Sequence, residues 1–190
     1  MAYDKITFLK NVTVLCDTNE QKNQHIKEEF DRMKVKYKDY NLLFGDYSFV
    51  IHDRDFSMLC VIERKANVDE LYGNLTADRE RIENEFRSAS AISNQFSLLM
   101  EGVKDMEELR TYTVPDWQMK REPQRKVSEI GEMCYVTLQS WQSGNKYHFN
   151  TIFVEDKSQT AVKILEHFYY YWRNFKILTA NRRNRKCQKS

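Results

Sequence analysis

Three short apolar runs in the first third of the chain each adjoin a carboxylate. The runs span residues 12–16, 47–51 and 58–62, and the carboxylates next to them are Asp17, Asp46 and Glu63. Continuous apolar runs of this length are typical of strands that are buried on both faces. A chain of this kind must therefore place a sheet in its interior. We expect the three carboxylates to lie where the buried strands reach solvent.

Carboxylates gathered at strand ends suit Mg²⁺ or Mn²⁺, because hard divalent cations take oxygen ligands. Lys65 follows Glu63 by two positions and points to the same strand face, whereas Arg64 points to the opposite face and has a supporting role. A fixed ammonium beside a bound metal stabilises the charge that grows on a phosphodiester under attack. The pattern predicts a phosphodiesterase site with Mg²⁺, or Mn²⁺ in its place, on Asp46 and Glu63. Asp17 is expected to bind the metal directly or through water.

The spacing of these residues resembles a known signature. Gly45 and Asp46 are followed after sixteen residues by Glu63-Arg64-Lys65, and after three more by Asp69. This arrangement is similar to the nuclease signature of the XPF/Hef-type structure-specific DNA endonucleases, and the likeness extends over residues 12–175. The resemblance implies a restriction-endonuclease-like α/β core with a central mixed sheet flanked by helices. It also implies cleavage of branched, flap or junction DNA.

The resemblance also bears on residues whose roles the pattern leaves open. It implies catalytic roles for Arg64 and Asp69 beside Lys65, although Asp69 could equally cap the helix that follows it. Glu20 is either a partner of a helix dipole or an outer metal ligand, and the resemblance favours the ligand. Arg79 matches an arginine near the active cleft of the family, although pairing along a solvated helix explains it equally well.

Composition predicts one domain, residues 1–178, followed by a basic and flexible tail, residues 179–190. The chain has 30 basic and 28 acidic residues, so its net charge of +2 does not by itself indicate a nucleic-acid partner. The candidate DNA-binding residues are Arg79, Arg81, Arg182, Arg183, Arg185 and Lys186. Four widely separated cysteines and the lack of a signal peptide or apolar span predict the cytoplasm of a bacterium or phage-infected host and no membrane partner.

Hydrophobic periodicity predicts how the elements follow one another. Helices are expected over 24–34, 67–88 with a break near 76–78, 127–141 and 160–175; strands over 12–16, 37–51, 57–62, 96–100 and 147–154; and a polar turn over 52–55. Residues 103–126 have no counterpart in the family signature. The aromatic residues of the last helix exceed what one face can bury, which predicts a homodimer through that helix. The alternative is a monomer in which residues 103–126 wrap this helix.

The sequence leaves open two alternatives to a structure-specific nuclease. A nuclease-fold subunit could hold DNA or a second subunit without cutting, yet such a subunit should have lost some of Asp46, Glu63 and Lys65, and this chain keeps all three. A simple nicking or restriction-type enzyme would share the core fold. No helix-hairpin-helix module follows the signature, so the DNA-binding module could come from a separate DNA-binding or replication partner, as in a compact phage enzyme.

Overall fold

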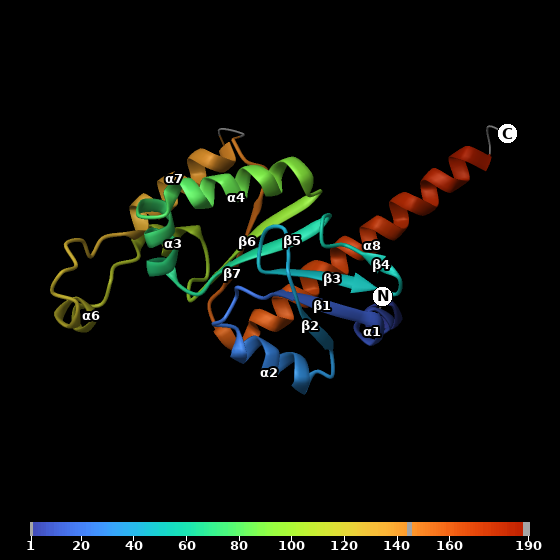
Figure 1. Cartoon of the computed structure of the whole chain (residues 1–190), viewed down its shortest axis with the longest axis horizontal. Helices are drawn as coiled ribbons and strands as arrows, with labels where there is room; N and C mark the ends of the chain where they lie inside the picture. The colour runs from blue at the N-terminus through green and yellow to red at the C-terminus, as the bar shows by residue number, and fades with distance from the viewer. Residues whose placement is uncertain (1, 144–145, 188–190) are drawn as a thin grey trace.

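The computed structural model describes the backbone of residues 2–143 and 146–187 and the side chains of residues 4–143 and 146–179. Its centre is a seven-stranded mixed sheet (Figure 1). The strands are β1 (Val12–Asp17), β2 (Lys36–Tyr40), β3 (Tyr47–Ile51), β4 (Arg54–Asp55), β5 (Cys60–Lys65), β6 (Gln95–Glu101) and β7 (Asn150–Val154). Their order across the sheet is β2-β1-β3-β5-β6-β7, with β4 paired to β3. The predicted mixed α/β architecture is confirmed.

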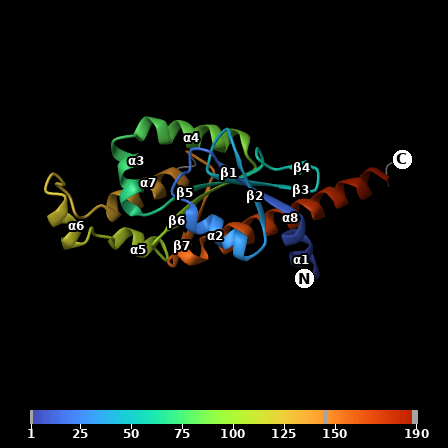
Figure 2. The same cartoon turned by 60° about the horizontal axis from the view of Figure 1, so that its bottom comes forward.

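Helices cover the two faces of the sheet in separate layers (Figures 1 and 2). One layer consists of α1 (Ala2–Asn11), α2 (Gln24–Arg32) and α8 (Thr160–Cys187), which follows a short 3-10 helix, η1 (Lys157–Gln159). The other consists of α3 (Val68–Thr76), α4 (Arg79–Ile92), α5 (Met106–Thr111) and α7 (Gly131–Ser143). A further short helix, α6 (Asp116–Arg121), stands away from both layers. No helix in the described residues is long and apolar enough to span a bilayer.

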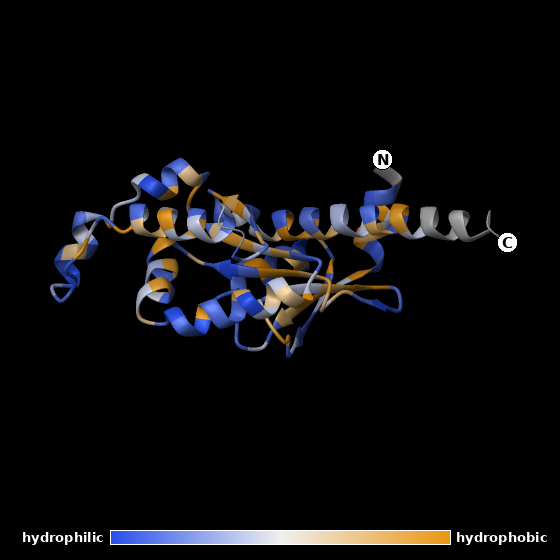
Figure 3. Cartoon of the chain, turned by 90° about the horizontal axis from the view of Figure 1, so that it is seen from above, coloured by the Kyte–Doolittle hydropathy of each residue, from blue (hydrophilic) through white to orange (hydrophobic). Residues whose placement is uncertain are grey.

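Side chains along β5 alternate between the two faces of the sheet, and this alternation sets the directions of the charged residues at the end of the strand. Ile62 belongs to the core under α1, α2 and α8, whereas Val61 belongs to the core under α3, α4 and α7. Much of the central sheet carries the hydrophobic colour in Figure 3, with hydrophilic segments on some strands, and the helices around it alternate between hydrophobic and hydrophilic. Because strand neighbours point to opposite faces, Glu63 and Lys65 face the α3–α4 layer and Arg64 faces the α2–α8 layer.

Two predictions for the first half of the chain need correction. The strand predicted over 37–51 is interrupted, because β2 ends at Tyr40 and β3 begins only at Tyr47. Gly45, with φ of +71°, has a left-handed backbone that cannot continue a strand. The polar turn predicted over 52–55 contains β4, which pairs with β3. The predicted helix break near 76–78 is confirmed, since α3 ends at Thr76 and α4 begins at Arg79.

Boundaries late in the chain also differ from prediction. The helix predicted over 127–141 begins at Gly131, where a Cβ would collide with the backbone of α5. The strand predicted over 147–154 begins at Asn150, because Tyr147 instead packs against the ring of Trp141. The last helix continues to Cys187 rather than ending near residue 175. Helix α1 was not predicted at all.

Candidate active site

Three strand ends meet at one point of the sheet. Because β1 and β3 are antiparallel, the last residue of β1, Asp17, lies beside Asp46, and its backbone N–H donates to the Asp46 carbonyl at 2.8 Å. The Asp46 N–H donates to the carbonyl of Ile62 at 2.8 Å, which holds Asp46 next to the end of β5. A Cβ on Gly45 would collide with the Val61 side chain, so glycine is required for this close approach.

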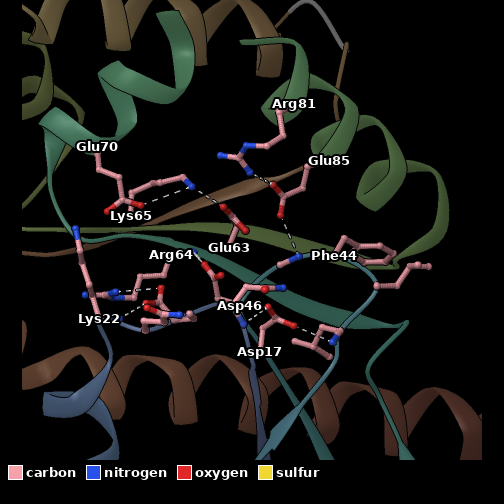
Figure 4. A pocket seen from close by; sticks show the side chains of 16 residues that line it. Asp17, Lys22, Phe44, Asp46, Glu63, Arg64, Lys65, Glu70, Arg81 and Glu85 are labelled. Atoms are coloured by element: carbon pink, nitrogen blue, oxygen red, sulfur yellow. Dashed lines mark hydrogen bonds and ion pairs between the residues drawn. The ribbon is translucent and has the colours of Figure 1, made fainter. Parts of the chain in front are cut away.

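The strand ends open into a cavity of about 570 Å³, shown from close by in Figure 4. The predicted site residues that line it are Asp17, Glu20, Asp46, Glu63, Arg64, Lys65 and Arg81. Glu63 and Lys65 are 3% and 4% exposed, and Lys65 Nζ lies 2.5 Å from Glu63 Oε1. The strand alternation therefore brings an acid and an ammonium group together at the cavity, as predicted from their spacing.

Burial and mutual charge shift the titration of these groups. Burial raises the pKa of Asp46 well above its usual value, and the neighbouring Glu63 carboxylate raises it further. Burial also acts to raise the pKa of Glu63, but Lys65 and the hydrogen bond with Glu85 outweigh it and hold that pKa below its usual range. Burial acts to lower the pKa of Lys65, but Glu63 and Asp46 raise it above its ordinary value. Lys65 is therefore a cation at neutral pH.

Glu85 is a member of the site that the sequence analysis missed. It lies on α4, lines the cavity, and accepts a hydrogen bond from the Gly45 N–H at 3.2 Å (Figure 4). Burial and the Glu63 carboxylate raise its pKa to about 8. Glu85 follows the buried Ile82 by three residues and precedes the buried Ala89 by four. A carboxylate on the buried stripe of an amphipathic helix is the signal that could have revealed it.

The raised pKa of Glu85 makes the stability of the metal-free protein depend on pH. The folded state binds this proton more tightly than the unfolded chain, so the free energy of unfolding should fall as pH rises from about 4.5 to about 8. Glu85→Gln removes this contribution. In EDTA, wild type should lose up to about 1.4 kcal/mol per pH unit relative to the variant. Urea denaturation at several pH values checks this, and parallel curves for the two proteins would contradict it.

Arg64 faces away from Glu63 and Lys65 and forms a buried network on the other side of the sheet. Its guanidinium makes two hydrogen bonds to Glu101, at 2.9 and 2.7 Å, and one to Glu20 at 3.2 Å. Glu101 also accepts from the Thr160 hydroxyl at 2.7 Å. Burial acts to raise the pKa of Glu101, but Arg64 and Thr160 outweigh it and lower that pKa. Arg64 and Glu20 are thus paired with charges within the fold, although both line the cavity.

Asp69 lies outside the cavity lining. Its Oδ2 accepts from the Tyr112 hydroxyl at 3.1 Å, and its Oδ1 pairs with Arg125, so both partners belong to the segment 103–126. It does not cap α3 either, because the Asn67 side chain accepts the hydrogen bond at the start of that helix. The spacing of Asp69 thus fits the signature, but its side chain contacts Tyr112 and Arg125 instead of the cavity.

The candidate DNA-binding arginines separate in the structure. Arg81 lines the cavity and lies 3.6 Å from Glu85, whereas Arg79 pairs with Glu83 at 2.9 Å on the outer side of α4. The backbone of α8 carries Arg182, Arg183, Arg185 and Lys186, whose side chains lie outside the described residues.

The donor set is suited to a hard divalent cation. Mg²⁺ keeps several waters and is commonly bound by one or two carboxylates, and Asp46 and Glu63 supply two in one cavity. Asp46 uses Oδ2 to accept the Arg64 N–H at 2.7 Å, which fixes the orientation of the carboxylate. Asp17 uses both oxygens to accept backbone N–H groups, from Asn19 and Leu42. Within the described part of the chain, no three Asp, Glu, His or Cys side chains form a ready-made metal cluster.

No protein-family model and no curated protein matches the chain. Among solved structures, XPF from Aeropyrum pernix is similar, with a TM-score of 0.56 and 17% identity over 84% of this chain and 61% of that chain. XPF from Aeropyrum pernix in complex with DNA gives the same TM-score and identity over 85% of this chain and 66% of the other. The chain thus spans less than two thirds of each, and it has the restriction-endonuclease-like fold that the sequence predicts, similar to that of XPF.

Proposed function

We propose that the chain is a divalent-metal-dependent DNA endonuclease that acts on branched, flap or junction DNA. The observation that carries the proposal is the convergence of Asp46, Glu63 and Lys65 in one cavity at the strand ends. One of the solved structures with a similar fold is XPF in complex with DNA, which supports a DNA substrate for this chain. Selectivity for branched DNA rests on the likeness to XPF in signature and fold.

The residues of the cavity have separate tasks in this proposal. Mg²⁺, or Mn²⁺ in its place, would supply positive charge at the scissile phosphate and would make bound water more acidic. Asp46 and Glu63 hold the ion, and Asp17 stabilises the loop before β3 through its hydrogen bond to the Leu42 N–H. Lys65, protonated at neutral pH, donates to the phosphate oxygens and offsets the negative charge that grows on them.

The role of Lys65 can be separated from metal binding. Lys65→Ala should still bind Mn²⁺, because both acidic ligands remain, but single-turnover cleavage should slow by roughly 10²–10³-fold, the usual cost of losing one preorganised stabiliser of the transition state. Quenched-flow cleavage and Mn²⁺ titration measure the two properties. An unchanged single-turnover rate would make Lys65 a structural partner of Glu63.

A covalently closed circular DNA tests the endonuclease proposal as such. Such a substrate has no ends, so only an enzyme that attacks an internal phosphodiester bond converts it to nicked or linear forms. A circle that carries an extruded hairpin junction should be cut in Mg²⁺, and one without a junction should be cut more slowly. A protein that binds both circles and cuts neither is a binding subunit.

The C-terminal part of α8 should contribute to affinity for DNA rather than to chemistry. Its cations are far in sequence from Asp46, Glu63 and Lys65. Truncation after Thr179 removes five basic residues, among them the four candidate phosphate contacts Arg182, Arg183, Arg185 and Lys186. Loss of those four contacts should reduce the slope of log K against log salt by roughly 3–4, since each contact contributes about 0.9. Saturating single-turnover cleavage should stay the same. Unchanged affinity and salt dependence would show that the segment has no part in binding.

A further inference from the structure

Residues 115–127 form a projection, here called the arm, that the proposed function leaves unexplained. Figures 1 and 2 both show its helix, α6, standing away from the two helical layers. The arm leaves and re-enters the fold at one place, because the Val114 N–H donates to the Ser128 carbonyl at 2.8 Å and the Gly131 N–H donates to the Tyr112 carbonyl at 3.1 Å. These bonds close the arm at its base.

The base of the arm is tied to the edge of the candidate active site. Asp69, on the first turn of α3, contacts the hydroxyl of Tyr112 at the base of the arm and the guanidinium of Arg125 within the arm. The next residue, Glu70, lines the cavity and lies 3.9 Å from Lys65 Nζ. A single turn of helix thus links the arm to the cavity, so a substrate that enters the cavity on this side comes close to the arm.

The arm carries an aromatic platform among cations. Trp117 is 60% exposed, whereas the other two tryptophans of the chain are buried. The Arg121 guanidinium lies 5.4 Å from the centre of the Trp117 ring. Residues 115–127 contain four basic and two acidic side chains, and the structure describes no ion pair for Lys120, Arg121 or Lys126. Single exposed apolar side chains are ordinary on protein surfaces. Trp117 differs because it shares the arm with cations for which the structure describes no ion pair, and because the arm lies beside a cavity suited to phosphodiesters.

We propose, resting on the proposed function, that the arm binds the single-stranded part of a branched DNA substrate. Trp117 stacks on an unpaired base, and Lys120, Arg121 and Lys126 contact the adjacent phosphates. Stacking of this kind tolerates any sequence, because every base has a π-face. In duplex DNA the faces of the bases are covered by their neighbours, so the ring has nothing to stack on. The arm therefore gives the protein a means to distinguish unpaired from paired DNA.

Charge favours DNA over a protein as the ligand of this surface. No residue of α6 is buried, and the guanidinium of Arg121 lies over the ring of its exposed tryptophan. Protein interfaces are depleted of lysine at their centre, whereas positive charge interleaved with an aromatic ring is the usual surface for single-stranded nucleic acid.

The test compares Trp117→Leu with Trp117→Phe, both in an Asp46→Asn background that prevents cleavage. Leucine is apolar but has no π-face, whereas phenylalanine can still stack. Fluorescence anisotropy gives the affinity for a fork with one single-stranded arm and for a fully paired duplex of equal length. Trp117→Leu should lose about 5- to 150-fold on the fork, the cost of one base–aromatic stack. It should lose much less on the duplex, and Trp117→Phe should restore most of the fork affinity.

The outcomes separate this inference from the proposed function. Equal fork affinity of Trp117→Leu and its Asp46→Asn parent overturns the proposal for the arm while DNA binding persists, and then a protein partner is the better ligand for Trp117. If the parent binds neither DNA, both proposals are overturned. Intrinsic fluorescence is a second readout, because Trp117 is the exposed tryptophan. Oligo(dT) should quench the emission of wild type and fail to quench that of Trp117→Leu, and quenching that persists in the variant counts against stacking.

Discussion

Asp46→Asn and Glu63→Gln are each expected to reduce DNA cleavage to background while the protein remains folded and still binds DNA. Each change removes one negative charge from the proposed metal site and leaves side-chain volume almost unchanged. Folding should not suffer in Asp46→Asn, because burial and the neighbouring Glu63 already disfavour a charge on Asp46. Glu63→Gln removes the buried carboxylate partner of Lys65 and should lower the free energy of unfolding, so its cleavage is measured under conditions in which circular dichroism shows it folded. Affinity for DNA should stay the same or increase, since the polyanion meets less negative charge.

The matched control is Glu166→Gln, which removes one carboxylate on α8. Glu166 pairs with Lys5 at 3.4 Å on the surface, and exposed pairs of this kind contribute little to stability. This variant should cut at the wild-type rate. Cleavage at full rate by either Asp46→Asn or Glu63→Gln would contradict the assignment of the site. Unfolding of both variants, seen by circular dichroism, would make the two carboxylates structural.

Glu101→Gln should destabilise the fold by about 3–5 kcal/mol, the cost of removing one partner from a buried ion pair. Glu101 is 0% exposed and Arg64 is 2% exposed. The variant therefore leaves the Arg64 guanidinium buried without the carboxylate that accepts two of its hydrogen bonds. Urea denaturation measures the loss. The contribution of the pair itself is tested by the double variant Arg64→Met, Glu101→Leu, which should be much more stable than the single variant. A single variant within 1 kcal/mol of wild type would contradict the buried network.

The experiment also separates two roles for Arg64. The resemblance of the sequence to the XPF/Hef-type signature implies a catalytic role, whereas the structure pairs the Arg64 side chain with Glu101 and Glu20 on the face away from Lys65. If the role is structural, a folded double variant should keep a substantial fraction of the cleavage activity. Loss of cleavage activity in a stably folded double variant would indicate that Arg64 takes part in catalysis.

The sequence was sufficient to predict how the strand ends converge. Period-2 alternation placed Glu63 and Lys65 together and Arg64 opposite, and this holds because β5 is a regular strand up to its last residue. The apolar runs around Asp17 and Asp46 became neighbouring antiparallel strands. The roles of these residues in metal binding and catalysis stay predictions.

Partners from distant parts of the chain were not predictable. Glu85 and Glu101 come from α4 and β6. The apolar stripe of α4 indicates that Glu85 faces the interior, but nothing in the local sequence indicates that these carboxylates contact Gly45 and Arg64. Tertiary packing alone decides such contacts. Asp69 shows the reverse problem, because its position in the signature suggested the site while its partners, Tyr112 and Arg125, lie in the segment without a family counterpart.

The aromatic residues of α8 illustrate the same limit. Phe168, Tyr169 and Trp172 are buried within the chain, and Phe8 of the unpredicted helix α1 packs against the rings of the latter two. Intramolecular burial therefore accounts for part of the aromatic surface from which a homodimer was predicted. Tyr170 remains 55% exposed, and the homodimer stays a prediction that light scattering at tens of micromolar would test.

The most direct test of the central claim is cleavage of end-labelled DNA by the purified chain. Fork, flap, four-way-junction and linear duplex substrates are each incubated with Mg²⁺, Mn²⁺ or EDTA, with Asp46→Asn in parallel. Cleavage of at least one branched substrate in Mg²⁺ or Mn²⁺, lost in EDTA and in Asp46→Asn, is the predicted result. Binding of these substrates with no cleavage in either metal ion, or cleavage that persists in EDTA, would contradict a metal-dependent endonuclease built on Asp46, Glu63 and Lys65.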